Sequence, residues 1–303
     1  MADVAQLVES QIVILVVAGS SPVVRPTEYC SILRLPSRSF LFFKILSMKK
    51  FDFLSILFGL LLSVIALYFM LRPSTATSAP ASSIPVLQIG NVWWDQTEMT
   101  IADVKTFADA TGFVSQAEKN GGGLSYEMGF VKKPGWSWKA PYGVPAKENE
   151  PAVHLNHKEA ASICHFYGKR LPTDTEWTSA AFLEQRINPP VGFSRNQRYP
   201  FPGGATSEVS HCLSGCGDYK GVAPVGALNR GTGHVAAGTT RPGVNGLLDM
   251  GGNVWEWTST ERNGGFITRG ASWWYGPERQ KESDVEIKSG DIAVVYIGFR
   301  CVS

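Results

Sequence analysis

The sequence has little charge and almost no excess of either sign. Only 18% of its 303 residues are charged, and the formal net charge at pH 7 is +2. A surface that binds nucleic acid needs concentrated positive charge, so this composition argues against a nucleic-acid partner. A wholly disordered chain is also excluded, because 44% of the residues are hydrophobic and such chains are poor in apolar residues.

Several catalytic signatures are missing as well. The sequence has no glycine-rich phosphate loop, no GxSxG elbow and no HExxH motif. It does have 31 glycines, 18 prolines and 9 tryptophans, which indicates a compact fold with much irregular backbone rather than a helical bundle. Loops are therefore expected to carry the function.

One long run contains no charged residue. It covers 19 residues, 53–71, which as a helix would rise about 28 Å and match the hydrocarbon core of a bilayer. Lys44, Lys49 and Lys50 precede it and Arg72 alone follows closely, which predicts a cytoplasmic N-terminus. We therefore predict a transmembrane anchor over residues 48–72, with the following chain on the periplasmic or extracellular side.

The segments on both sides of this anchor have their own character. Residues 1–47 are interpreted as an upstream extension or a cytoplasmic segment, because Met48 and two lysines resemble a start of translation. Residues 73–85 are rich in Pro, Ser and Ala and are predicted to form a tether. A cleavable signal peptide is the alternative, although the apolar run is long for one. The folded domain is then predicted over residues 86–303.

Three capping motifs predict helices in this domain. They lie at residues 100–103, 156–159 and 173–176, each a polar N-cap followed three residues later by an acidic residue. After Arg186, glycine and proline recur as far as Gly246, and regular segments are limited to short runs such as 266–269 and 292–299. These patterns predict an α+β domain with little regular secondary structure.

Cysteine spacing limits the possible disulfides. Cys30 precedes the predicted anchor, and four cysteines follow it: Cys164, Cys212, Cys216 and Cys301. Cys212 and Cys216 are close enough to pair, which would leave Cys164 to pair with Cys301. Two alternatives remain open at this point: buried free thiols, or a zinc site at Cys212 and Cys216 with His211, which lacks the usual CxxC spacing.

Four motifs carry a family resemblance. They are GKRLPTDTEW at 168–177, GLLDMGGNVWEW at 246–257, RGASW at 269–273 and GFRC at 298–301. In this order they resemble the formylglycine-generating enzymes, also called sulfatase-modifying factors, and the resemblance extends from about residue 86 to the end. It implies one loop-rich domain, a variant of the C-type-lectin fold, and a disulfide between Cys164 and Cys301.

The founding chemistry of that family is the copper-dependent oxidation of a sulfatase cysteine to formylglycine. It needs two thiolates shortly after the third motif, because cuprous ion is a soft metal that prefers thiolate ligands. In this sequence Tyr275 and Gln280 stand at about those positions, and neither supplies a thiolate. Copper is therefore not expected as a cofactor.

The resemblance also implies calcium. The site would consist of side-chain and carbonyl oxygens from Asp249, Gly252, Val254 and Glu256. The alternative is that Asp249 caps the loop and that Glu256 accepts backbone amides. A second, altered site would involve Asp218 and the carbonyl of Tyr219.

His154, His157 and Glu159 suggest a metal triad at first sight. Their spacing across a predicted helix start argues against convergence on one ion, so structural hydrogen bonds are expected instead.

The segment that follows the short regular run at residues 266–269 corresponds, by the same resemblance, to the segment that lines the substrate groove of the family. Its candidate substrate-contacting or catalytic residues are Arg269, Ser272, Trp273, Trp274, Tyr275 and Gln280. Aromatic walls with a few polar groups suit a small-molecule or peptide pocket. Adjacent side chains in an extended segment face opposite ways, so one of the two tryptophans is expected to pack in the core.

Together these patterns predict an extracytoplasmic, membrane-tethered member of the family. Its function would be the oxidation or maturation of a small molecule or an exported partner protein, without formylglycine generation. Whether the chain is an enzyme stays open at this point. One alternative is a non-catalytic binding module on a lectin-like scaffold, and another is copper-dependent formylglycine generation by Cys212 and Cys216.

Overall fold

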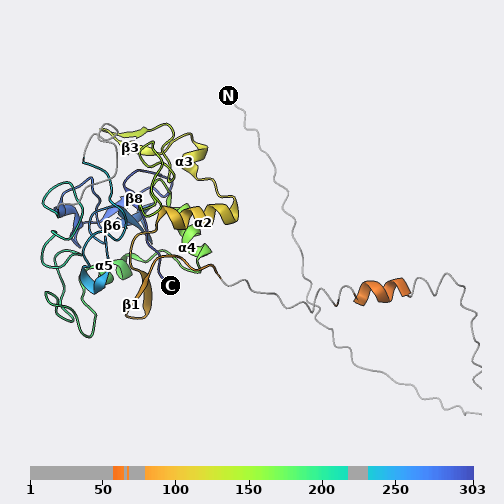
Figure 1. The fold of residues 1–303 in the computed structure, drawn as a ribbon, viewed down its shortest axis with the longest axis horizontal. Helices are drawn as coiled ribbons and strands as arrows, with labels where there is room; N and C mark the ends of the chain where they lie inside the picture. The colour runs from red at the N-terminus through yellow and green to blue at the C-terminus, as the bar shows by residue number, and fades with distance from the viewer. Residues whose placement is uncertain (1–56, 65–66, 68–78, 218–230) are drawn as a thin grey trace, which may run out of the picture. The chain divides into compact units, whose positions relative to one another are not determined.

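The computed structural model describes residues 57–64, 67, 79–217 and 231–303 (Figure 1). The chain divides into two units between Ser74 and Thr75. In the first unit residues 57–64 are helical, and no helix among the described residues has the length and apolar character needed to cross a bilayer. Most of the predicted anchor at 48–72 lies outside the described residues, so it stays a prediction.

The second unit starts before the predicted domain boundary. The last part of the predicted tether contacts the domain, because Ser83 donates its backbone N–H to the carboxylate of Asp103 at 3.0 Å. Ile84, the next residue, is buried in the core. The polar tether composition therefore gives way to packed chain at Ser82–Ile84, because Asp103 at a helix start offers an acceptor for these donors.

The three helices predicted from capping motifs are present. They are α2 (Ile101–Thr111), α4 (His157–Phe166) and α5 (Asp174–Phe182). Thr100, Asn156 and Thr173 each accept a hydrogen bond from the backbone N–H three residues later. Helices α2 and α4 lie against each other (Figure 1). Helix α2 ends at Gly112, whose φ of 70° is the left-handed conformation that glycine adopts at low cost.

The strands are short, as expected for a loop-rich domain. Two hairpins are formed by β1 (Val86–Ile89) with β2 (Val92–Asp95), and by β3 (Leu124–Tyr126) with β4 (Phe130–Lys132). A four-stranded sheet has the order β7-β6-β5-β8. Its strands are β5 (Trp255–Arg262), β6 (Gly265–Arg269), β7 (Glu286–Lys288) and β8 (Ile297–Gly298). Strand β8 is parallel to β5, and the other pairs are antiparallel.

Three short elements complete the described domain, namely α3 (Gln116–Lys119), η2 (Val244–Gly246) and η3 (Pro277–Gln280). The apolar run at 292–299 forms much less strand than its pattern suggests, since only Ile297–Gly298 pair as β8. The preceding residues Val294, Val295 and Tyr296 are buried in irregular backbone. Burial therefore explains their apolar character without a longer strand.

Most of the tryptophans lie in the core. Eight of the nine are buried, and Trp93 alone is 47% exposed. A larger cluster contains Trp136, Trp138, Trp255, Trp257, Trp273 and Trp274. A smaller cluster is built around Trp94 and Trp177. Because each aromatic ring buries a large apolar area, these residues stabilise a domain that has few long helices or strands.

Both disulfides join the cysteines that sequence spacing pairs. Cys164 in α4 is bonded to Cys301 near the C-terminus, with Cα atoms 5.5 Å apart. Cys212 and Cys216 are bonded within one loop, with Cα atoms 5.6 Å apart. The first pair is completely buried, whereas both members of the second are half-exposed. These four residues are therefore neither free thiols nor zinc ligands in this structure.

The two disulfides are expected to contribute unequally to stability. Replacing both Cys164 and Cys301 by alanine should lower the free energy of unfolding by about 3 to 5 kcal/mol, because the bond closes a long loop. The Cys212→Ala, Cys216→Ala variant should lose only about 2 kcal/mol, because its loop is short. Urea unfolding of unreduced protein, followed by tryptophan fluorescence, measures both. Equal losses would contradict the loop-length argument.

Candidate functional site

The predicted groove segment begins at the end of β6. Five of its six candidate side chains are buried, and Tyr275 alone is half-buried. The buried ones are Arg269, Ser272, Trp273, Trp274 and Gln280. The Arg269 guanidinium donates to the carboxylate of Asp174 at 2.5 Å and 3.1 Å. It also donates to the backbone carbonyls of Glu282 and Asp284. Arg269 thus connects the start of α5 to the loop before β7.

Both neighbouring tryptophans pack in the core. Their rings meet edge to face with centroids 4.8 Å apart. Trp273 also approaches Tyr142, and Trp274 approaches Tyr296. The Ser272 hydroxyl accepts a hydrogen bond from the backbone N–H of Trp274 at 3.3 Å. The expectation that one tryptophan of the pair packs inside therefore extends to both, and neither faces solvent.

Tyr275 lies closer to the surface, in an aromatic and charged cluster. Its ring is half-buried and meets the Trp255 ring with centroids 5.8 Å apart. The Arg279 guanidinium lies 5.3 Å from the centre of the Tyr275 ring and 5.8 Å from that of Trp255. Arg279 is also paired with Asp284 at 2.9 Å and with Glu286. Tyr275 therefore sits in a site where a cation is already held by two carboxylates.

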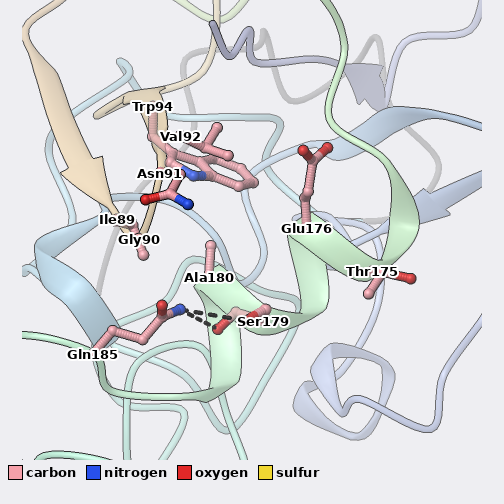
Figure 2. Close-up of a pocket in the computed structure, with 10 residues that line it drawn as sticks. All are labelled: Ile89, Gly90, Asn91, Val92, Trp94, Thr175, Glu176, Ser179, Ala180 and Gln185. Atoms are coloured by element: carbon pink, nitrogen blue, oxygen red, sulfur yellow. Dashed lines mark hydrogen bonds between the residues drawn. The ribbon is translucent and has the colours of Figure 1, made fainter.

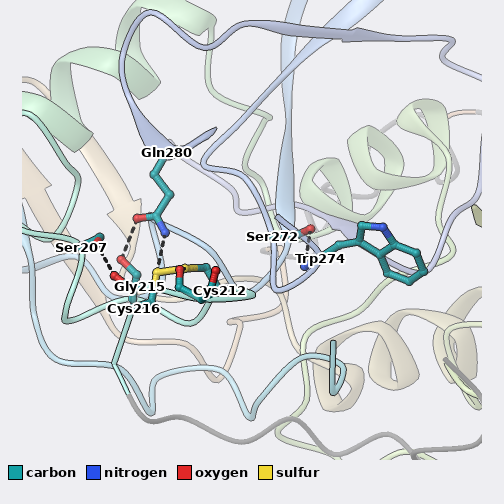
Figure 3. Close-up of a disulfide and its surroundings, with 9 residues drawn as sticks. Ser207, Cys212, Gly215, Cys216, Ser272, Trp274 and Gln280 are labelled. Carbon is teal, nitrogen blue, oxygen red and sulfur yellow. Dashed lines mark hydrogen bonds between the residues drawn. A yellow bond between two sulfur atoms is a disulfide. The ribbon is translucent and has the colours of Figure 1, made fainter. Parts of the chain in front are cut away.

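Gln280 points from η3 toward the Cys212–Cys216 disulfide (Figure 3). Its side chain is buried, and Oε1 accepts a hydrogen bond from the Ser210 hydroxyl at 2.9 Å. The amide Nε2 donates to Sγ of Cys216 at 3.2 Å. Among the six groove candidates, Gln280 is the one whose side chain touches sulfur, and no described residue of the segment offers a thiolate.

The two carboxylates expected to bind calcium have protein partners. Asp249 accepts from the Thr240 hydroxyl and from the Gly238 backbone N–H, both at 2.5 Å. Glu256 accepts from Nε1 of Trp177 at 2.7 Å. Burial raises the pKa of the Asp249 carboxyl, and the Thr240 and Gly238 hydrogen bonds partly offset that rise.

Arg300 is the cation that Glu256 holds. Its Nε and Nη2 atoms donate to the two Glu256 carboxylate oxygens at 2.6 to 2.9 Å. The remaining guanidinium donors reach the backbone carbonyls of Asp95, Gln96 and Leu248. A carboxylate and three carbonyl oxygens thus converge on a buried guanidinium.

As arranged, these residues do not fit a calcium ion. A metal at Glu256 would have to displace Arg300, which would then be a buried charge without a partner. No group of three or more His, Cys, Asp or Glu side chains suited to a metal occurs within residues 79–217 and 231–303. Asp218 and Tyr219 lie outside the described residues.

Glu98 is a further buried acid, and it contacts the loop that precedes β5. Its Oε2 accepts from the Asn253 amide at 2.6 Å, and Oε1 accepts from the Val254 backbone N–H at 3.2 Å. Burial raises its pKa well above the usual range, and the nearby Asp249 and Glu256 charges add to that effect. Sequence reasoning assigned no role to Glu98, because its partners lie more than 150 residues away in the chain.

The suspected metal triad does not converge. His154 is buried, and its Nε2 lies 2.9 Å from the carbonyl oxygen of Pro141. Burial lowers the pKa of His154 to about 4. The His157 ring stacks on Phe266 with centroids 3.4 Å apart, and Glu159 closes the capping box of α4. All three side chains have structural partners.

A hydrogen-bonded chain of three buried side chains was not anticipated. The Tyr142 hydroxyl lies 2.7 Å from Nδ1 of His234, whose Nε2 lies 3.1 Å from Oε2 of Glu150. Burial lowers the pKa of His234, while Glu150 opposes that shift. Tyr142 and Glu150 also line a cavity of about 300 Å³. This row of three hydrogen-bonded side chains can hold a proton. Because 84 or more residues separate His234 from its two partners, no local sequence motif reveals the arrangement.

Two other cavities lie away from the groove segment. One, of about 270 Å³, lies between the β1–β2 hairpin and α5 (Figure 2). Its polar lining includes Asn91, Ser179 and Gln185, and the Gln185 amide is already bonded to Ser179. The other, of about 480 Å³, lies along α2, with Phe113 and Trp138 in its lining. Neither cavity contains a groove candidate.

Comparisons with known proteins agree with the motif pattern. The family model described as "Sulfatase-modifying factor enzyme 1-like domain" matches residues 70–303. The formylglycine-generating enzyme of Mus musculus is 28% identical over 213 residues, which cover 60% of this chain and 51% of the relative. The inactive C-alpha-formylglycine-generating enzyme 2 of Mus musculus is 30% identical over 189 residues, covering 55% and 54%.

Other matches have different names. Hercynine oxygenase of Mycolicibacterium thermoresistibile is 29% identical over 187 residues, which cover 58% of this chain and 36% of the relative. The chain thus spans about half the length, or less, of these curated relatives. Among solved structures, PvdO from Pseudomonas aeruginosa is similar with a TM-score of 0.46 and 15% identity, covering 70% of this chain and 79% of that chain.

The buried Glu256–Arg300 pair generates a stability prediction. Glu256→Gln should lower the free energy of unfolding by about 3 to 5 kcal/mol, because it leaves the Arg300 charge buried and uncompensated. The control is Glu176→Gln, which weakens the exposed pair with Arg170 but keeps a capping side chain; it should cost less than about 1 kcal/mol. Urea unfolding measures both, and equal midpoints would show that the buried pair is dispensable.

Proposed function

Since the chain belongs to the family of sulfatase-modifying factor enzyme 1-like domains, we propose that it is an oxidative maturation factor. Its substrate would be a small molecule or an exported partner protein, and it would not be a copper-dependent formylglycine-generating oxidase. The observation that carries this proposal is the state of the sulfur atoms. Positions 275 and 280 hold Tyr and Gln, and the four cysteines among the described residues are all paired in disulfides.

The absence of a thiolate pair in the described domain bears directly on copper. Cuprous ion is held by soft sulfur ligands, and a disulfide sulfur is a poor substitute for a thiolate. Gln280 supplies an amide, which is already bonded to Ser210 and Cys216. Formylglycine generation by Cys212 and Cys216 would first require that their bond be reduced.

Export is part of the proposal. Disulfides persist in oxidising compartments, and the described domain contains two of them. The predicted anchor over residues 48–72 would tether the domain to the membrane, with its folded part on the periplasmic or extracellular side.

The action is proposed to take place where the loop 207–217 meets the segment 275–280, which we call the disulfide surface. Tyr275, Arg279 and the two loop cysteines are half-exposed there. Trp273 and Trp274, which precede Tyr275 in the chain, are buried in the core. A half-exposed aromatic ring beside a held cation suits contact with a polar or aromatic substrate group.

Metal binding distinguishes this proposal from copper chemistry. After treatment with a chelator, the purified protein should bind no Cu(I) at the four described cysteines and no Ca²⁺ at Asp249 and Glu256, because these sulfurs and oxygens have protein partners. Calorimetric titration with each ion should give the same heat for the wild-type chain and for an Asp249→Asn, Glu256→Gln variant, and a CxPxR peptide with added copper should cause no oxygen uptake. A family member with both copper cysteines serves as the positive control. Stoichiometric Cu(I) together with peptide oxidation would overturn the proposal.

The maturation role can be tested in cells. Deleting the gene should change the mass or thiol content of at least one exported molecule, and the wild-type chain should restore it. Tyr275→Ala should reduce this restoration about tenfold or more, because it removes an aromatic substrate contact. Ile187→Ala, at a side chain that is 74% exposed and distant in sequence, is the control and should restore fully.

Melting curves of the variants separate contact from stability. Tyr275→Ala should lower the melting temperature by a few degrees, because its half-buried ring packs on Trp255, but the variant should stay fully folded at the assay temperature. If deletion changes no exported molecule, the maturation role fails and a non-catalytic binding module becomes the better interpretation.

A further inference from the structure

The two disulfides of the domain lie in very different surroundings. Cys164 and Cys301 are completely buried, and a thiol could reach them only after the core opened. Cys212 and Cys216 are half-exposed and lie in a loop beside the groove segment (Figure 3). Exposed disulfides are the ones that exchange readily with thiols.

The loop that carries the second disulfide is held by contacts other than the disulfide itself. The Ser207 hydroxyl donates to the carbonyl of Gly215 at 2.8 Å. The backbone N–H of Leu213 donates to the carbonyl of Tyr275 at 2.9 Å, and that of Gly217 donates to Ser210 at 3.2 Å. The loop can therefore keep its shape when the sulfur–sulfur bond opens, which keeps both sulfurs in reach of each other.

The two sulfurs of this bond have opposite neighbours. Sγ of Cys216 faces the donating amide of Gln280 at 3.2 Å, which would stabilise a thiolate there. Sγ of Cys212 faces the carbonyl oxygen of Ser214 at 3.1 Å, which can accept from a thiol but repels a thiolate. Because the better leaving group in thiol–disulfide exchange is the more stable thiolate, Cys216 should leave and Cys212 should be attacked.

We infer that the Cys212–Cys216 disulfide is a redox site that oxidises thiols of a small molecule or an exported protein. The inference deepens the proposed function and rests on it. A substrate thiolate attacks Sγ of Cys212, and the electron pair of the sulfur–sulfur bond leaves on Cys216. A second substrate thiol then attacks the mixed disulfide and releases Cys212.

These two exchange steps transfer two electrons and two protons from the substrate to the protein. The substrate dithiol becomes a disulfide, and the Cys212–Cys216 bond becomes two thiols. Return to the starting state requires a second, more oxidising disulfide, for which oxidised glutathione is the experimental stand-in. Gln280 acts as a positioning residue, since it touches the sulfur that leaves and not the substrate.

Differential reduction of the wild-type chain is the first test. The purified full chain is incubated with reduced glutathione or dithiothreitol without denaturant, then alkylated and mapped by mass. Cys212 and Cys216 should be labelled about 100-fold faster than Cys164 and Cys301, because the buried pair requires opening of the core. In guanidinium the two pairs should react alike, which controls for intrinsic reactivity. Equal protection of both pairs in native protein would overturn the inference.

Gln280→Leu tests the asymmetry between the two sulfurs. In the reduced protein it should raise the pH at which Cys216 becomes half-alkylated, and it should slow exchange about tenfold, since the thiolate loses its donor. Gln88→Leu, at an exposed position on β1, is the matched control and should change neither quantity. An unchanged pH profile in Gln280→Leu would contradict the role of Gln280, whereas a purely structural residue would alter only the melting temperature.

The cellular assay separates this inference from the proposed function. If gene deletion changes an exported molecule and the Cys212→Ser, Cys216→Ser chain fails to restore it, both the maturation role and the redox site are supported. If that double variant restores it fully, the redox site is refuted while the maturation role stands. If deletion has no effect, the maturation role fails, and glutathione exchange on the purified chain decides whether the disulfide is reactive.

Discussion

The ion pair between Glu256 and Arg300 is the contact on which the rest of the domain depends. It is completely buried, and every guanidinium donor has an oxygen partner, either a Glu256 oxygen or one of three backbone carbonyls. Removing a charge from water costs several kcal/mol unless such partners replace the solvent. The pair therefore fixes one arrangement of the segments that meet at it: the end of β2, the loop before β5, β5 itself and the C-terminal segment.

This arrangement explains why the four motifs predict the fold better than the activity. Trp177 in the first motif and Glu256 in the second are hydrogen-bonded to each other, and Arg300 in the last completes the contact. Arg269, at the start of the third motif, holds the helix that contains Trp177 through Asp174. The residues that carry the family resemblance are thus mostly structural, so family membership leaves the reaction to be decided by the half-exposed residues nearby.

Features encoded by neighbouring residues could be predicted from the sequence, and features that need long-range contacts could not. The helix starts at Thr100, Asn156 and Thr173 follow from caps that lie within four residues. The 212–216 disulfide follows from spacing alone, and it leaves one partner for Cys164. By contrast, the chain from Tyr142 through His234 to Glu150 depends on how long loops cross. The burial of both Trp273 and Trp274 was also hidden, because alternation describes a strand and this segment is irregular.

The position of Gln280 connects the absence of one chemistry with the presence of another. The resemblance implies that formylglycine-generating enzymes have a copper-binding thiolate at about position 280. In those enzymes copper and oxygen together would accept the electrons from a substrate sulfur. Here the side chain at 280 donates instead to a disulfide sulfur supplied by another loop. A sulfur–sulfur bond also accepts two electrons from thiols, and it needs no soft metal to do so. The substrate sulfur would then be oxidised by bond exchange at the same surface, so loss of the copper ligands does not require loss of redox function.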